Sequence, residues 1–303
     1  MITKLEQLFE CIKNVKTQVI TVAAAEDEEV LLAVKEACEK NIVIPILIGD
    51  EAKIKSIAKE IAFNIDNVEV ISTSSLEESA EVAVKLVSSG KADFVMKGLL
   101  DTSILLKAVL NKEWGLRTDS LLSHVMVYEL PKYHKLLVST DGGMNIAPNY
   151  DQKVKIVKNA VQATKALGID TIKIAAIAAK EKVNPKMQAT VDARALQEAC
   201  ENGEFGNDVI LEGPLAFDLA VSKEACEIKK FETRVGGDTD IMLVPTIEVG
   251  NGIGKSFALM ADGKSAGVIM GAKAPIVLVS RADTHESKLY SIAYGALIAS
   301  NNK

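Results

Sequence analysis

The chain has 303 residues, of which 48% are hydrophobic and 25% charged, and its formal net charge is −6. This composition is that of a globular protein, and the negative charge argues against broad nucleic-acid binding. Only 4% of the residues are aromatic, so we expect an aliphatic core, which suits parallel-sheet α/β architecture better than a β-sandwich.

Neither a membrane span nor a signal peptide is predicted. No apolar run approaches the roughly 20 residues that cross a bilayer, and the first residues lack the apolar region of a signal peptide. Cys11, Cys38, Cys200 and Cys226 show no C-x-x-C spacing and have no histidine partners nearby. We therefore expect reduced, buried thiols and a cytoplasmic protein without membrane or nucleic-acid partners.

Strand and helix patterns alternate along the first part of the chain. Strands are predicted at 18–24, 43–48, 68–71 and 94–96. Helices are predicted at 27–40, 50–61, 74–90 and 102–111. This alternation favours a parallel sheet with right-handed crossover connections.

A second run of elements begins with a strand at 125–128, directly before the turn residues Glu129-Leu130-Pro131 that interrupt the pattern. Its predicted strands are 125–128, 136–139, 172–178, 208–211, 241–244, 267–270 and 276–279, and its helices are 150–167 and 188–200. We therefore predict two α/β domains with a boundary near residue 130. The pattern leaves open whether the last strand and helix return to the first domain.

The segment after residue 276 carries the strongest functional signal. An apolar run at 276–279 predicts a buried parallel strand that delivers Ser280 and Arg281 to its carboxyl end, before an amphipathic helix. Open α/β sheets bind ligands at such strand ends, beside helix N-termini that favour anions. With the carboxylates Asp283 and Glu286 close by, this segment is a candidate phosphate site. The alternative is a helix cap with a surface ion pair.

Three further segments place polar residues at strand ends or in loops. Lys97-Gly98 precedes a helix that Thr102 or Ser103 could cap, and Arg117-Thr118 lies in a loop just before a strand. Residues 211–215 form a third predicted strand-end turn. The simpler alternatives are a helix cap, a solvated arginine and an ordinary turn.

Residues 248–256 are rich in glycine but match no nucleotide-binding motif. Val249 stands where a Walker loop needs glycine, and Lys255 stands where the dinucleotide pattern needs its third glycine. We expect a loop with bare N–H groups, in which Asn251 and Lys255 open a helix and which suits a phosphate or a ligand backbone. The alternative is a flexible turn that leads into a surface helix. The three histidines lack metal-ligand spacing and no G-x-S-x-G motif occurs, so neither a metal centre nor a hydrolase triad is predicted.

In their order along the chain, these segments resemble the phosphate acetyl/butyryl transferase family. The matching residues are Met96-Lys97-Gly98 with Thr102, Leu116-Arg117-Thr118, Ser123-His124-Val125, Asn184-Pro185-Lys186-Met187, Glu212-Gly213-Pro214-Leu215-Ala216, Glu248-Val249-Gly250-Asn251 and Ser280-Arg281-Ala282-Asp283-Thr284-His285-Glu286. They extend over most of the chain. The resemblance is closer to the butyryl branch, because the acetyl branch has a longer loop at 250–255 and a Ser-Arg-Gly turn at 280–282.

The resemblance implies two doubly wound α/β/α domains of the isocitrate-dehydrogenase-like type, with a cleft between them. It also implies that the C-terminal segment returns, giving domains 1–130 plus 272–303 and 131–271. The implied reaction is reversible transfer of a short-chain acyl group, butyryl or branched C4–C5, between CoA and inorganic phosphate. Acyl-CoA and phosphate are then substrates of a homodimer or larger homo-oligomer, with no metal and no permanently bound cofactor.

The resemblance also assigns roles to single residues. The family's catalytic serine maps onto Ser280, and its phosphate-binding arginines map onto Arg281 and Arg117, with Thr118 beside the latter. The family's general base falls near Glu286, with Asp283 as the second choice. The residues expected to contact CoA or the acyl substrate are Lys97, Gly98, Thr102, Gly250, Asn251 and Lys255.

Three other functions stay open on sequence alone. A phosphate acetyltransferase would use the same chemistry on a shorter acyl chain. A decarboxylating dehydrogenase of the same fold would need a carboxylate metal site and a nicotinamide site, and neither pattern is found. A non-catalytic regulator that binds CoA or acyl phosphate would not need Ser280, Arg281 and Arg117 together.

Overall fold

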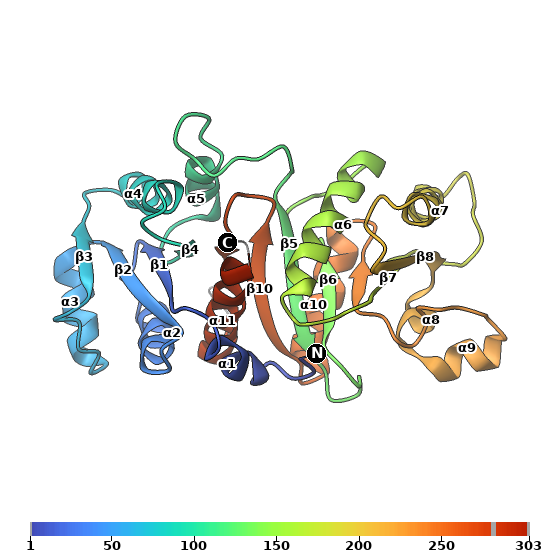
Figure 1. Cartoon of the computed structure of the whole chain (residues 1–303), viewed down its shortest axis with the longest axis horizontal. Coiled ribbons are helices and arrows are strands. Elements are labelled where there is room, and N and C mark those ends of the chain that lie inside the picture. The colour runs from blue at the N-terminus through green and yellow to red at the C-terminus, as the bar shows by residue number, and fades with distance from the viewer. Residues whose placement is uncertain (1, 280–282, 302–303) are drawn as a thin grey trace. The chain divides into compact units, whose positions relative to one another are not determined.

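The computed structural model describes residues 2–279 and 283–301. The chain forms two compact units, and we call residues Glu6–Ser120 with Ala266–Lys303 the first unit. Met1–Leu5 with Leu121–Ser265 make up the second unit. Strands and helices alternate in both (Figure 1), which confirms the predicted α/β class. None of the helices in the described part of the chain has the length and hydropathy of a membrane span.

The first unit is built on a mostly parallel sheet in the order β3-β2-β1-β4-β11-β10. Its strands are β1 (Gln18–Ala23), β2 (Val43–Gly49), β3 (Glu69–Ser72), β4 (Phe94–Lys97), β10 (Lys264–Met270) and β11 (Ile276–Val277). β11 pairs in parallel with β4, and β10 pairs with β11 in the antiparallel sense. The last strand of the chain, β11, therefore lies beside a strand formed some 180 residues earlier.

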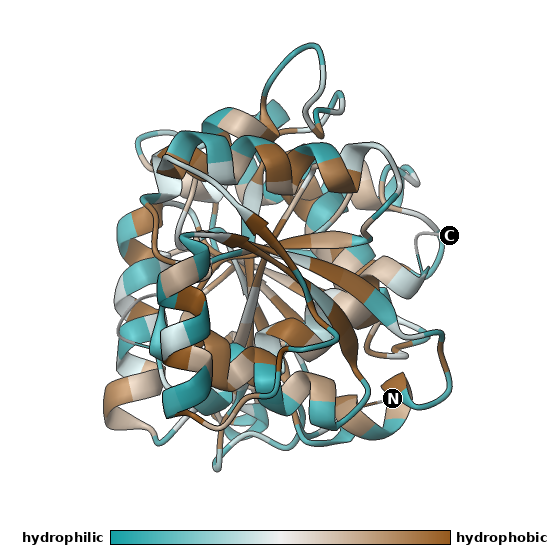
Figure 2. Cartoon of the chain, turned by 90° about the vertical axis from the view of Figure 1, so that its left-hand side faces the viewer, coloured by the Kyte–Doolittle hydropathy of each residue, from teal (hydrophilic) through white to brown (hydrophobic). Residues whose placement is uncertain are grey.

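Helices connect these strands, and capping side chains mark where several of them begin. They are α1 (Gln7–Ile12), α2 (Glu28–Glu39), α3 (Glu51–Glu60), α4 (Leu76–Ser88), α5 (Thr102–Val109) and α11 (His285–Asn301). Asp27, Asp50 and Ser75 each accept a backbone N–H from the first turn of the helix that follows, as N-cap residues do. Figure 2 shows apolar strands inside and polar residues on the outer helix faces.

The last helix, α11, is not amphipathic, so that prediction is wrong. Every residue from 288 to 299 is buried, and the helix contacts α1, α2 and the strands β1, β4 and β11. Its small residues allow this close packing: a Cβ on Gly295 would lie 2.8 Å from a Val277 methyl. A helix that is apolar on all sides is an interior helix.

The second unit has a sheet in the order β5-β6-β9-β7-β8. Its strands are β5 (Ser123–Glu129), β6 (Leu137–Thr140), β7 (Ile172–Ile177), β8 (Val209–Leu215) and β9 (Ile241–Leu243). Its helices are α6 (Tyr150–Lys165), α7 (Gln188–Glu201), α8 (Phe217–Val221), α9 (Lys223–Lys229) and α10 (Ile247–Met260). The β5–β6 hairpin is antiparallel and the other pairs are parallel. The turn predicted at 211–215 is wrong, because these residues belong to β8.

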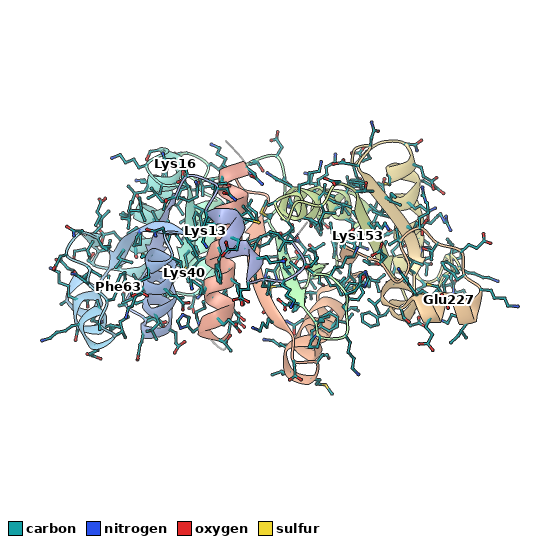
Figure 3. All side chains as sticks on the ribbon, turned by 60° about the horizontal axis from the view of Figure 1, so that its bottom comes forward. Lys13, Lys16, Lys40, Phe63, Lys153 and Glu227 are labelled. Atoms are coloured by element: carbon teal, nitrogen blue, oxygen red, sulfur yellow. The ribbon has the colours of Figure 1, made fainter. Side chains whose placement is uncertain are left out.

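Two groups of charged side chains, the first of them buried, join elements of the second unit. Lys153 of α6 (Figure 3) lies 2.6 Å from Asp192 of α7, and both side chains are 6% exposed. Asp238 accepts hydrogen bonds from Lys173 and His134 near the start of β9. Burial would raise the pKa of the Asp238 carboxyl, but the hydrogen bonds from Lys173, His134 and Lys135 outweigh burial and lower it well below its usual value.

The glycine-rich segment 248–256 is helical, so the predicted open loop is wrong. It lies within α10, where the N–H of Gly250 bonds to the carbonyl of Thr246. The glycines serve packing: a Cβ on Gly250 would lie 2.6 Å from the Gly142 Cα, and one on Gly254 would meet the Tyr128 hydroxyl. The low helix propensity of glycine is offset here by contacts that no larger residue permits.

We expect two alanine substitutions in α10 to have opposite effects on stability. Gly250→Ala should destabilise the protein by about 1–3 kcal/mol, because backbone atoms must move to admit the methyl group. Gly252→Ala, where a Cβ meets nothing within 4 Å, should stabilise it by about 0.5–1 kcal/mol. Urea unfolding of both variants measures the difference, and equal effects would show that close packing does not explain Gly250.

Candidate functional site

The predicted site residues fall on several separate elements. Lys97, Gly98 and Thr102 lie at the end of β4 and the start of α5, and Arg117 and Thr118 follow α5 in the first unit. Asp283 and Glu286 lie at the start of α11. In the second unit, Gly250, Asn251 and Lys255 lie on α10. Ser280 and Arg281 lie outside the described residues.

The carboxyl end of β4 is held tightly against that of β1. The N–H of Gly98 donates to the carbonyl of Ala23 at 2.8 Å, and the N–H of Leu99 donates to that of Ala24 at 2.7 Å. A Cβ on Gly98 would lie 2.6 Å from the Ala23 oxygen and would clash with Ala24 as well. Glycine is therefore required at this strand end for steric reasons.

Lys97 places a buried ammonium group at the same strand end. The residue is 6% exposed, and its Nζ donates to the carbonyls of Gly98 (3.1 Å) and Leu100 (3.0 Å). These bonds hold the turn between β4 and α5. The predicted cap at Thr102 or Ser103 is wrong, because α5 begins at Thr102 itself and Asp101 is its N-cap residue.

Arg117 lies on a loop with several anchoring contacts. Gly115 allows the chain to turn after α5, where a Cβ would lie 2.5 Å from the carbonyl oxygens of Val109 and Asn111. The N–H of Leu116 then bonds to the Val109 carbonyl at 2.7 Å. Arg117 itself is exposed and forms no ion pair within residues 2–279 and 283–301. An unpaired guanidinium on an anchored loop is well suited to hold an anion.

β11 ends beside β4, although it is shorter than predicted. The strand covers only Ile276 and Val277 rather than 276–279, and Val277 pairs with Met96. β11 therefore ends level with Met96, one residue before β4 ends at Lys97. Ser280 and Arg281 follow three and four residues after Val277 in the sequence.

The start of α11 lies toward a different edge of this sheet. His285 pairs with Glu36 at 2.9 Å, and Tyr290 stacks on Phe9 with ring centroids 5.4 Å apart. Glu36 is in the last turn of α2, and its Oε1 lies 3.4 Å from the Nζ of Lys40. α2 runs from the carboxyl end of β1 to the amino end of β2. The structure therefore does not bring the start of α11 beside Lys97-Gly98.

Glu286, the predicted base, already has a hydrogen-bond partner. Its side chain is exposed, and its Oε1 accepts from the hydroxyl of Tyr290 at 3.1 Å. Asp283, the second choice, is half-buried, and its backbone carbonyl accepts from the ammonium of Lys288 at 2.5 Å. The carboxylate of Glu286 and the backbone carbonyl of Asp283 therefore take part in hydrogen bonds within the first turns of α11.

The sequence reasoning missed a polar loop in the second unit, at the carboxyl end of β6. Asp141 is 2% exposed, and its carboxylate accepts backbone N–H groups from Gly143, Met144 and Asn145. A Cβ on Gly143 would lie 2.6 Å from the ring nitrogen Nδ1 of His124. The available signal was an Asp-Gly-Gly sequence directly after an apolar strand.

Throughout the described part of the chain, no group of three or more His, Cys, Asp or Glu side chains is arranged to hold a metal ion. All four cysteines are free thiols, but only Cys226 is fully buried and the other three are partly exposed.

Comparison with known proteins places these features in a family. The family model described as phosphate acetyl/butaryl transferase matches residues 3–85 and 71–296. The phosphate butyryltransferase of Clostridium acetobutylicum is 42% identical over 301 residues, which cover 99% of this chain and 100% of that protein. The probable phosphate butyryltransferase of Bacillus subtilis is 48% identical over 278 residues, 92% of each chain.

A solved structure agrees with this match. The branched-chain phosphotransacylase from Enterococcus faecalis V583 superposes with a TM-score of 0.82 at 34% identity, over 93% of this chain and 99% of that one. The family model and the sequence relatives each cover nearly the whole chain. This chain therefore belongs to the phosphate acetyl/butaryl transferase family.

Proposed function

We propose that this chain is a phosphotransacylase that reversibly transfers a butyryl or branched C4–C5 acyl group between CoA and inorganic phosphate. The observation that carries the proposal is the near-complete alignment with a phosphate butyryltransferase, at 42% identity over 99% of this chain. Arg117 supports it, because this arginine is exposed and forms no ion pair with a described residue. The carboxyl ends of β4 and β11 support it as well, since such strand ends bind ligands.

The reaction joins phosphate to the acyl group of a thioester. A phosphate oxygen attacks the carbonyl carbon, the carbon–sulfur bond breaks, and the CoA thiolate leaves. The oxyanion formed on the way needs a positioned hydroxyl or N–H donor, a role that we assign to Ser280. Arginine forks suit the phosphate dianion, and we assign this role to Arg281 and Arg117. Holding both substrates together supplies much of the rate, so no covalent intermediate is required.

The reverse reaction needs a group that takes the thiol proton. We propose Glu286 for this role, with Asp283 as the second choice, on the strength of the family resemblance. Glu286 is exposed. A carboxylate close to a thiol with an ordinary pKa near 8.5 favours the reactive thiolate.

The other predicted site residues are proposed to bind CoA or the acyl substrate. Asn251 and Lys255 are exposed on α10 and are proposed to bind CoA. Lys97 and Thr102 are proposed to contact substrate at the end of β4. Gly98 and Gly250 are better explained by the close contacts described above. We further propose a homo-oligomer that acts in the cytoplasm without metal or permanently bound cofactor.

Turnover of acyl-CoA esters of different chain length tests both the proposed reaction and the assignment to the butyryl branch of the family. With phosphate saturating and neither metal nor NAD added, butyryl- and isobutyryl-CoA should release thiol with kcat/KM at least about tenfold above acetyl-CoA. The reason is that each methylene buried in an apolar pocket contributes about 0.8 kcal/mol. If kcat/KM is highest for acetyl-CoA, the chain belongs to the acetyl branch instead of the butyryl branch. If no acyl-CoA releases thiol, the proposal of a transacylase is wrong.

Substitutions at Ser280 and Arg281 test the site assignment. Ser280→Ala should lower kcat by roughly 10²–10³, the effect of losing one oxyanion donor. Arg281→Lys should mainly raise KM for phosphate, because a point charge replaces a bidentate fork. Steady-state kinetics at varied phosphate measures both effects, with circular dichroism to check folding. Wild-type activity in both folded variants would show that the site lies elsewhere.

The pH dependence of two carboxamide variants tests the base. Glu286→Gln should slow acyl-CoA synthesis more at pH 7 than at pH 9, because at pH 9 most of a thiol with pKa near 8.5 is already ionised. Rates for Glu286→Gln and the matched Asp283→Asn over this range decide between the two carboxylates. A pH-independent loss in Glu286→Gln would show that its bond to Tyr290 is structural.

A further inference from the structure

We propose that Thr118 is a positioning residue that sets the affinity for phosphate by fixing Arg117 against the turn before β11. The inference rests on the proposed function, and it concerns how Arg117 is held rather than what it binds. It gives Thr118 a role different from the direct phosphate contact expected from the sequence.

Thr118 bridges two segments that are 153 residues apart in the chain. Its Oγ1 donates a hydrogen bond to the carbonyl of Gly271 at 2.6 Å, and the same oxygen accepts the N–H of Ser120 at 3.0 Å. A threonine hydroxyl has a single hydrogen to donate. Because Gly271 takes that hydrogen, the hydroxyl cannot also donate to a phosphate, which offers only acceptors at its ionised oxygens.

A second bond joins the same two segments on the other side of Arg117. The N–H of Lys273 donates to the carbonyl of Leu116 at 2.9 Å. Leu116 is 1% exposed, so this side of the loop is also held by packing. Arg117 is thus the exposed residue between two attachment points, Leu116 and Thr118.

The partner segment is itself well defined. Gly271 has φ 97°, a conformation that favours glycine, and it directly follows β10. Five residues later the chain enters β11, whose Ile276 and Val277 pair with β4. The two bonds therefore tie the loop of Arg117 to the turn that leads into β11.

The physical effect of this attachment is preorganisation. A long arginine side chain on a free loop must lose backbone and side-chain entropy when it binds an anion. Because the backbone is attached on both sides of Arg117, much of the backbone entropy is already lost in the free protein. Phosphate binding then costs less conformational entropy. Loss of one attachment should weaken the binding of phosphate and leave the binding of the acyl-CoA thioester unchanged.

The test compares valine and serine at position 118. Thr118→Val keeps the shape and removes the hydroxyl, so KM for phosphate and its Kd from calorimetry should rise about tenfold, while KM for butyryl-CoA stays the same. Thr118→Ser keeps the hydroxyl and should stay within about twofold of wild type. Thr17→Val is the matched control, because Thr17 also donates to a distant carbonyl, that of Asn41, away from this loop.

A double-mutant cycle separates positioning from direct binding. If Thr118 acts through Arg117, Thr118→Val should change phosphate affinity by less than about twofold in an Arg117→Ala background. An equal tenfold loss in both backgrounds would show that Thr118 contacts phosphate itself and would overturn the inference. A Thr118→Ser variant that binds phosphate as weakly as Thr118→Val would also overturn the inference.

Calorimetric measurement of phosphate binding without acyl-CoA tests the role of Thr118 separately from the proposed reaction. If the wild-type protein binds phosphate but releases no thiol, the transacylase proposal fails while the calorimetric comparison still decides the role of Thr118. If the wild-type protein neither binds phosphate nor turns over acyl-CoA, both proposals are overturned.

Discussion

The candidate site depends on the pairing of two short strands that are far apart in the sequence. Val277 of β11 pairs with Met96 of β4, so the segment that leads to Ser280 leaves the sheet level with Lys97. Parallel strands expose their carboxyl ends at one edge of a sheet, which is where such folds bind ligands. This pairing therefore fixes where the chain leaves the first unit's sheet on its way to Ser280.

Close backbone contacts set the positions of the surrounding loops. Gly98 lets the end of β4 press on β1, and Gly115 lets the loop of Arg117 turn back on the end of α5. Gly250 lets α10 approach the Asp141 loop in the second unit. Glycine thus acts in three places through the absence of a side chain, and its abundance near the motifs reflects packing as much as ligand binding.

Much of the α/β pattern could be predicted from the sequence, because apolar runs and capping residues are local signals. The strands β1, β2, β4 and β7 and the helices α2, α4, α6 and α7 lie close to the predicted ranges. Recognising α10 as a helix required knowledge of Gly142 and Tyr128, which contact its glycines from elsewhere in the chain. Local propensity opposes a helix there, and tertiary packing overrides it.

The burial of α11 on all sides could not be predicted for a similar reason. Its alanines and glycine look neutral in sequence, whereas their small size lets the helix pack on all sides against α1, α2 and the sheet. The start of the helix is fixed by the pair His285–Glu36 and the stack of Tyr290 on Phe9. Neither partner is near in sequence, so the distance of Glu286 from the end of β4 emerged only in the structure.

The proposed phosphate site at the strand ends requires that phosphate itself attacks the thioester carbonyl. This can be followed by ³¹P NMR with butyryl-CoA and phosphate labelled with ¹⁸O in all four oxygens. The account predicts butyryl phosphate that keeps all four labelled oxygens on phosphorus, formed in step with free CoA. Release of CoA with butyrate and unchanged phosphate would show that water is the nucleophile and would contradict the account.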